Sequence, residues 1–211
     1  MNTAEKNPSF EDIFGNRSRP TPEAMKGFTI TPERWAEALE YYDEHQMELV
    51  KAAAFSRRTA TSHRDFKVGA AIMAIEPNLP EDEYGIYTSH NLNPYPGFNE
   101  GREKACAERM GLEAAKSWAK GVVSITTVSK ETTTGDHNKS HDALHPCSEC
   151  RTMLRDMLKE GFVREDTIIC NVNDAKKEVS INSTEEEIVI EKRTVKELLD
   201  LYDDDKDDKI Q

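Results

Sequence analysis

Two short segments that carry three cysteines and one glutamate constrain this chain more than any other feature. They read Cys106-Ala107-Glu108 and Pro146-Cys147-Ser148-Glu149-Cys150. Three thiolates can hold a zinc ion and leave its fourth tetrahedral position open. A carboxylate that lies so close to a ligand can then handle the protons of a water at that position. The two segments therefore predict a metal site with an adjacent proton carrier.

The length and charge of the chain limit the classes of protein to which it can belong. Its 211 residues suit one domain with extensions. The formal net charge of -12 argues against a nucleic-acid polymer as substrate, because neutralising phosphates requires Lys and Arg on one face. We find no signal peptide and no long apolar run, so we expect a soluble, cytoplasmic protein without a membrane partner. In a reducing cytosol, cysteines indicate metal ligands or free thiols rather than disulfides.

Hydrophobic periodicity and turn residues predict an alternation of helices and strands. We expect helices over 32–57, 105–120, 146–161 and 194–201. We expect strands over 66–75, 84–92, 122–128, 167–172 and 187–190, with the second strand antiparallel to the first. This order favours an α/β fold, in which a mixed sheet is covered by helices on both faces.

The two ends of the chain differ in composition from its middle. Residues 1–28 hold Asn, Pro, Ser, Gly and charges without periodicity, and we interpret them as a flexible arm. Residues 203–211 are dominated by Asp and are predicted to form a solvated acidic tail. The folded domain is then expected over 29–202, and it contains both cysteine segments.

Each cysteine segment lies at the start of a predicted helix, which suits the thiols to be ligands. A helix N-terminus carries partial positive charge and free N–H groups, which lower the pKa of a thiol. Cys106, Cys147 and Cys150 are therefore the predicted metal ligands. Arg109 could donate hydrogen bonds to their sulfurs and offset the charge of three thiolates. Glu108 would carry protons without ligating the metal, and the spacing C-x-E…P-C-x-x-C is the signature of zinc deaminases.

The remaining cysteine and the histidines leave other readings open. Cys170 could complete a closed Cys₄ structural zinc site. It lies in a predicted strand without a partner at zinc-knuckle spacing, and we interpret it as a buried free thiol. His137, His141 and His145 precede the second segment and could in principle bind metal, but we interpret them as exposed residues of a polar loop.

Four segments of the chain together resemble the cytidine deaminase family, in its small three-cysteine branch. They are Phe66-Lys67-Val68-Gly69-Ala70-Ala71, Cys106-Ala107-Glu108-Arg109, Pro146-Cys147-Ser148-Glu149-Cys150-Arg151 and Thr194-Val195-Lys196-Glu197-Leu198-Leu199. The similarity covers about 45–202. Proteins of this family hydrolyse cytidine and deoxycytidine to uridine and deoxyuridine in pyrimidine salvage, usually as homotetramers.

The resemblance implies a cytidine deaminase-like three-layer α/β/α sandwich with a mixed five-stranded central sheet. It implies hydrolytic deamination of a free cytosine nucleoside. It also implies that Zn²⁺ is held by Cys106, Cys147 and Cys150, with Glu108 as the proton shuttle. A homotetramer is the implied assembly, and a nucleoside is the implied partner.

The substrate contacts implied by the resemblance include one departure. Phe66 would line the pyrimidine pocket, the backbone N–H of Ala107 would contact the base carbonyl, and Asn91 would contact the ribose. The family binds the ribose through an N-x-E motif, whereas this chain reads Asn91-Leu92-Asn93. An uncharged Asn93 should hold a hydroxyl more weakly than a carboxylate does. A deaminase of a modified nucleoside such as blasticidin S is therefore an alternative, as is a non-catalytic structural-zinc protein.

Overall fold

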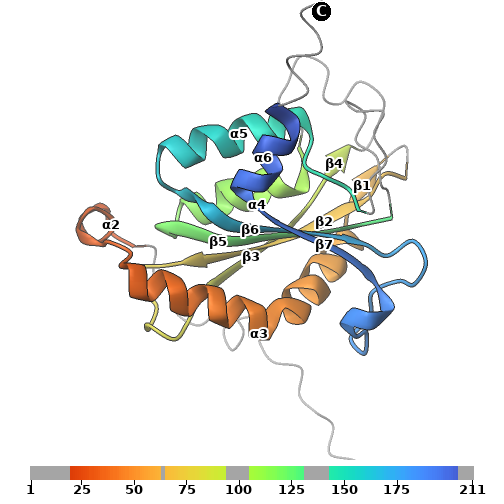
Figure 1. Cartoon of the computed structure of the whole chain (residues 1–211), viewed down its shortest axis with the longest axis horizontal. Helices are drawn as coiled ribbons and strands as arrows, with labels where there is room; N and C mark the ends of the chain where they lie inside the picture. The colour runs from red at the N-terminus through yellow and green to blue at the C-terminus, as the bar shows by residue number, and fades with distance from the viewer. Residues whose placement is uncertain (1–19, 63–64, 94–104, 131–142, 204–211) are drawn as a thin grey trace, which may run out of the picture.

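The computed structural model describes residues 20–62, 65–93, 105–130 and 143–203, and these form a three-layer α/β/α sandwich (Figure 1). The central sheet has five strands in the order β3-β2-β5-β6-β7. Their bounds are β2 Val68–Ile75, β3 Gly85–His90, β5 Gly121–Ser129, β6 Val163–Asn173 and β7 Val189–Thr194. Within this sheet β5 and β6 pair in parallel, and the other neighbouring strands are antiparallel. The predicted fold class, with its mixed five-stranded sheet, is confirmed.

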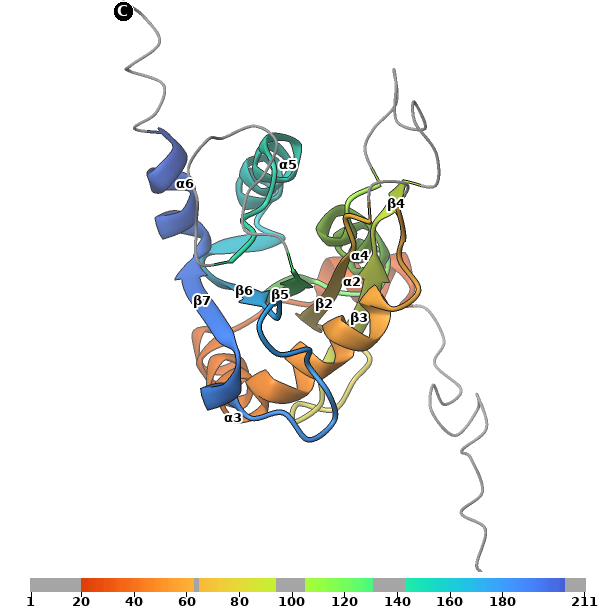
Figure 2. The ribbon, with the colours of Figure 1, turned by 90° about the vertical axis from the view of Figure 1, so that its right-hand side faces the viewer.

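The helices cover the two faces of the sheet unequally (Figure 2). One face carries the long helix α3, Pro32–Arg57, which buries Trp35, Tyr42 and Val50 against Met73 and Val172. The other face carries α4, α5 and α6, which span Ala107–Lys116, Ser148–Lys159 and Val195–Asp203. The residues that lead directly into α4 and α5 therefore lie on the face of the sheet opposite α3.

Helix α3 approaches strand β2 more closely than a side chain would allow. A Cβ atom added to Gly69 would lie 2.0 Å from the carbonyl oxygen of Ala53. Every residue of β2 is buried. The glycine in the predicted F-x-V-G-A-A strand is therefore a packing requirement, which lets α3 seal one face of β2 while the other face remains available to α4.

Helix and strand bounds agree with the sequence best where local signals are strong. Helix α3 begins and ends where predicted, since the Thr31 side chain accepts a hydrogen bond from the Arg34 N–H and Pro32 occupies the first turn. Strand β7 was predicted over 187–190, but it covers Val189–Thr194. The difference arises because a 3₁₀ turn, Glu185–Glu187, precedes it and because the polar edge residues 191–193 pair with β6.

Three short elements were not predicted. Helix α2, Pro22–Gly27, lies in the predicted arm of residues 1–28 and begins at Thr21, whose hydroxyl accepts from the Ala24 N–H. Strands β1, Thr61–Ser62, and β4, Leu92–Asn93, form a separate parallel pair. Residues 1–19 of the arm and 204–211 of the acidic tail lie outside the described residues.

None of the helices in the described ranges is long and apolar enough to cross a membrane.

Candidate active site

Three of the four cysteine side chains lie together where α4 and α5 begin. Cys106 and Cys147 are the N-cap residues of these two helices, and neither thiol makes a capping hydrogen bond. The Sγ atom of Cys147 lies 3.7 Å from that of Cys106 and 3.5 Å from that of Cys150. A Zn–S bond of about 2.3 Å places two sulfurs of a tetrahedral site about 3.8 Å apart. The three sulfurs, all within 4.8 Å of one another, could therefore hold a metal ion.

The crowding of the three thiols has an electrostatic consequence that differs from the sequence expectation. Hydrogen bonding to Cys147 raises the pKa of Cys106, and hydrogen bonding to Cys106 raises the pKa of Cys150. These contacts between thiols shift the pKa of Cys106 and Cys150 in the direction opposite to the lowering expected from a helix N-terminus. Three adjacent thiolates repel one another, and a bound cation is the group that makes a coordinating thiol ionise.

Cys170 lies on the other side of the sheet. Its side chain is fully buried in the core under α3, with Tyr42 and Val172, whereas α4 and α5 cover the opposite face. It is not part of the thiol cluster among the described residues. Burial raises the pKa of Cys170 to about 11, which is typical of a neutral structural thiol.

Glu108 is a buried carboxyl group in the first turn of α4, with 7% of its surface exposed. Burial raises the pKa of Glu108 to about 7, although a hydrogen bond from the backbone lowers it in part. The neighbouring Cys147 raises it further, and the charge of Glu108 in turn raises the pKa of Cys106. The carboxyl group of Glu108 thus interacts electrostatically with the thiols beside which the sequence analysis predicted it to carry protons.

The predicted substrate-binding residues surround the start of β2. Phe66 and Ala107 pack in one small cluster with Val68. Asn91 accepts a hydrogen bond from the Val68 N–H at 2.8 Å and donates one to the Phe66 carbonyl at 2.7 Å. Its amide therefore fixes the backbone on both sides of Lys67, and the predicted ribose contact would have to coexist with these bonds.

Two further predicted residues lie beside the cysteine segments. Asn93 ends β4, and the Leu92 N–H just before it donates to the carbonyl of Ala105, the residue that precedes Cys106. Arg109 lines a surface cavity of about 450 Å³ between α4 and α5, together with Ser148 and Glu149. The pairing of Leu92 with Ala105 therefore brings Asn93 near the first cysteine segment, and Arg109 follows Cys106 by one helical turn.

Sequence analysis missed the contacts of two polar side chains that flank Cys147 in the sequence. The Sγ of Cys147 lies 3.9 Å from a carboxylate oxygen of Glu149. His145, predicted to be exposed, is only 1% exposed, and its ring nitrogens contact Tyr202 and Glu191. The exposure predicted for His145 is therefore wrong, because partners distant in the sequence bury it. His137 and His141 lie outside the described residues.

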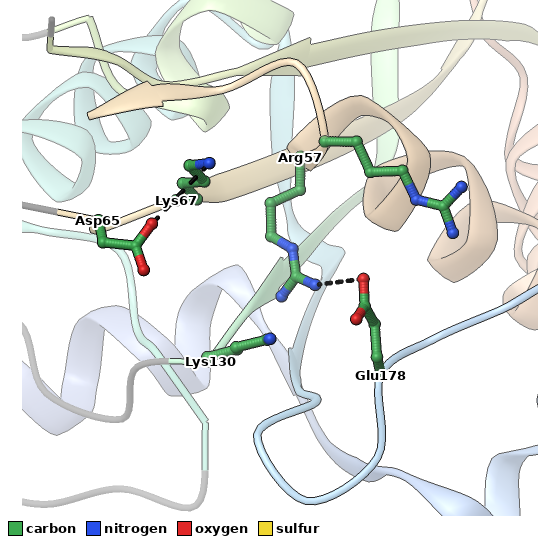
Figure 3. A pocket seen from close by; sticks show the side chains of 6 residues that line it. Arg57, Asp65, Lys67, Lys130 and Glu178 are labelled. Carbon is green, nitrogen blue, oxygen red and sulfur yellow. Dashed lines mark ion pairs between the residues drawn. The ribbon is translucent and has the colours of Figure 1, made fainter. Parts of the chain in front are cut away.

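A second cavity, of about 290 Å³, lies at the end of α3 and carries mixed charge (Figure 3). Its lining residues are Arg57, Arg58, Lys67 and Lys130 together with Asp65 and Glu178. The guanidinium of Arg57 is buried, donates to the buried Asp174 and also approaches Glu178 at 3.8 Å. Arg57 is the buried cation of this cavity, and Asp174 neutralises its charge. We therefore prefer the thiol cluster as the candidate active site.

Comparison with known proteins gives matches only among solved structures. No protein-family model and no curated protein matches the sequence. A cytidine deaminase from Burkholderia pseudomallei is 19% identical, covers 72% of this chain and 93% of its own, and has a TM-score of 0.45. The enzyme from Mycobacterium leprae is 20% identical over 72% and 94% of the two chains, with a TM-score of 0.42. The enzyme from Mycobacterium tuberculosis is 17% identical over 72% and 91%, with a TM-score of 0.40.

The family that the sequence motifs resemble is thus also the family named for these structures. Both the identities and the TM-scores are low. The support for a function therefore comes from the residues of the thiol cluster and its surroundings.

Proposed function

We propose that this protein is a zinc-dependent hydrolase that deaminates a free cytosine nucleoside, converting cytidine or deoxycytidine to uridine or deoxyuridine. The observation that carries the proposal is the cluster of three thiols with a buried carboxyl group, Glu108, beside it. A purely structural metal site has no use for a buried carboxylate that does not ligate the metal. This argument favours an enzyme over a non-catalytic zinc protein.

The donor set fits zinc in an open, catalytic arrangement. Cys106, Cys147 and Cys150 would supply three ligands, and the fourth thiol is on the opposite face of the sheet. Zinc bound there would lower the pKa of a water to about 7. Three soft sulfur donors favour zinc over magnesium or calcium, which prefer oxygen ligands.

The chain's own residues would perform the remaining steps. The carboxylate of Glu108 would accept a proton from the attacking water and deliver it to the ring nitrogen of the cytosine as the water oxygen bonds to the amino-bearing carbon. It would then take the second proton of that oxygen and pass it to the amino group, so that the carbon–nitrogen bond breaks and ammonia leaves. The wall made by Phe66 and Ala107 would hold the pyrimidine and exclude water from the site. The N–H of Ala107 would donate to the base carbonyl. Arg109 would donate to the ligand sulfurs.

A panel of nucleosides tests the proposal directly. Purified protein loaded with zinc would be incubated with cytidine, deoxycytidine, adenosine and blasticidin S, and the change in absorbance of each base on deamination would be followed. We expect turnover of at least one cytosine nucleoside and none of adenosine. Preference for blasticidin S over cytidine would favour the alternative reading that Asn93 motivates. An absence of turnover on all four compounds by zinc-loaded protein would refute the proposal.

We expect Asn93 to set the preference for the sugar. A charged acceptor of a hydroxyl is worth about 1.5–3 kcal/mol and a neutral one about 0.5–1.5 kcal/mol. The difference, about 1.4 kcal/mol, corresponds to roughly tenfold in specificity. Asn93→Glu should therefore raise kcat/KM for cytidine by about tenfold and leave a nucleoside without sugar hydroxyls unchanged. Equal changes for both substrates would show that Asn93 does not contact the sugar.

We also propose a homotetramer, on the basis of the family resemblance. Sedimentation velocity at micromolar concentration and physiological salt would measure the assembly, and a monomer under these conditions would contradict the proposed tetramer.

The cytoplasmic location stays a prediction from the sequence.

A further inference from the structure

The segment that presents Cys147 has no regular secondary structure. Residues 144–147 directly precede the first turn of α5 and belong to no strand or helix. Such a segment must be fixed by other contacts if its thiol is to keep one position. Its side chains and carbonyls therefore need partners elsewhere in the fold.

The ring of His145 is fixed by two elements far away in the sequence. Its Nδ1 atom lies 2.9 Å from the hydroxyl of Tyr202 in α6. Its Nε2 atom lies 2.7 Å from a carboxylate oxygen of Glu191 in β7. The rings of His145 and Tyr202 also meet edge to face, and their centroids are 5.9 Å apart. The residue two positions before Cys147 is thus held from both sides.

These contacts form a consistent chain of donors and acceptors. An ionised carboxylate can only accept, so the Nε2–H of His145 donates to Glu191, while its Nδ1 pairs with the Tyr202 hydroxyl. The same carboxylate oxygen accepts from Arg193 Nε at 2.8 Å and Nη2 at 2.7 Å. Burial raises the pKa of Glu191, but Arg193 and then His145 outweigh this and lower it, which keeps the acceptor ionised.

Arg151 forms a second connection between α6 and the same segment. Its Nη1 donates to the carbonyl of Pro146 at 2.7 Å, and its guanidinium lies 3.8 Å from the centroid of the Tyr202 ring. Arg151 directly follows Cys150 and is buried. Tyr202 therefore contacts a side chain on each side of the Cys147–Cys150 pair. In Figure 1, α6 lies next to α5 on the face of the sheet that carries the thiols.

We propose that β7 and α6 position Cys147 and Cys150 for the metal through a clamp formed by His145, Tyr202, Glu191 and Arg151. This proposal rests on the proposed metal-binding function and deepens it. Tyr202 and Glu191 are positioning residues, since they act on the thiols through His145 and Arg151. The last helix of the fold thereby becomes part of the metal site without contributing a ligand.

Tyr202→Phe is the sharpest test, because it removes one hydroxyl and keeps the ring beneath Arg151. Zinc affinity would be measured by competition with a chromophoric chelator. Changes in groups that orient metal ligands cost about 10- to 100-fold in affinity. We expect Tyr202→Phe to weaken zinc binding by about tenfold and to shift the visible absorption of the cobalt(II) protein. Glu191→Gln, which leaves the tyrosine in place, should act in the same direction.

Tyr84→Phe is a matched control. Its hydroxyl accepts from Arg34 at 2.8 Å, and the same guanidinium lies 4.4 Å from the centroid of its ring. This tyrosine packs in the core under α3, away from the thiols. We expect its zinc affinity and cobalt spectrum to equal those of the unchanged protein. Zinc affinity of Tyr202→Phe within twofold of this control would overturn the clamp and leave the proposed function intact.

Hydrogen exchange of the metal-free proteins separates the two proposals. We expect the peptide over 144–150 to exchange faster in Tyr202→Phe than in Tyr84→Phe, with equal melting temperatures. If the unchanged protein bound no zinc, the proposed function would fail, yet this comparison would still decide the clamp. Equal exchange in the two variants would then overturn it.

Discussion

Glu108→Gln is expected to keep zinc and fold while it lowers kcat by at least about 10²-fold. General acid–base steps contribute about 10²- to 10⁴-fold, and here a single carboxyl group would serve several proton transfers. Glutamine is nearly isosteric, but it cannot accept and deliver a proton. Glu108 is buried, and burial disfavours its charged form. A neutral glutamine at this position is therefore expected to keep the fold. Turnover, zinc content and melting temperature would be measured on the same preparation.

Glu113→Gln provides the control for this loss. Glu113 belongs to the same helix, α4, but it is exposed and borders the surface cavity between α4 and α5. Its replacement should leave turnover within about twofold, because exposed substitutions outside such sites have small effects. If Glu108→Gln kept activity within about tenfold of the unchanged enzyme, Glu108 would not be the proton shuttle.

The sequence predicted the fold best where one local signal was sufficient. The cap at Thr31 and the proline after it define the start of α3, and a continuous apolar run defines β2. Strand β7 was placed too early because three residues in its second half, 191–193, are charged. They become strand only by pairing with β6, and an edge strand can expose such side chains.

The sequence predicted which thiols lie together, but not the residues that hold them in place. Cysteine spacing is a local property, so it identifies the thiols that the structure brings together. The partners of His145 lie 46 and 57 residues away, and nothing near it in the sequence indicates them. The rise in the pKa of Cys106 and Cys150 was not predicted for the same reason. The helix starts are visible in the sequence, whereas the crowding of three sulfurs appears only in three dimensions.

The ligand set is tested most strongly by a pair of cysteine replacements. Cys150→Ser is expected to weaken zinc binding by more than about 100-fold, because a change in a group that merely orients a ligand already costs about 10- to 100-fold. Cys170→Ala is expected to retain one zinc per chain. Alanine is preferred there because a serine hydroxyl would be buried among apolar side chains at a cost in stability.

The contrast between the two cysteines follows from the sheet that separates them. Cys150 shares the α4 and α5 face with two other thiols, whereas Cys170 packs under α3 as a neutral thiol. Metal per chain would be determined by mass spectrometry of the native protein and by chelator competition. Loss of zinc from Cys170→Ala, with an unchanged melting temperature, would favour a closed four-thiol site. Since such a site has no open position for water, that result would also remove the basis for catalysis.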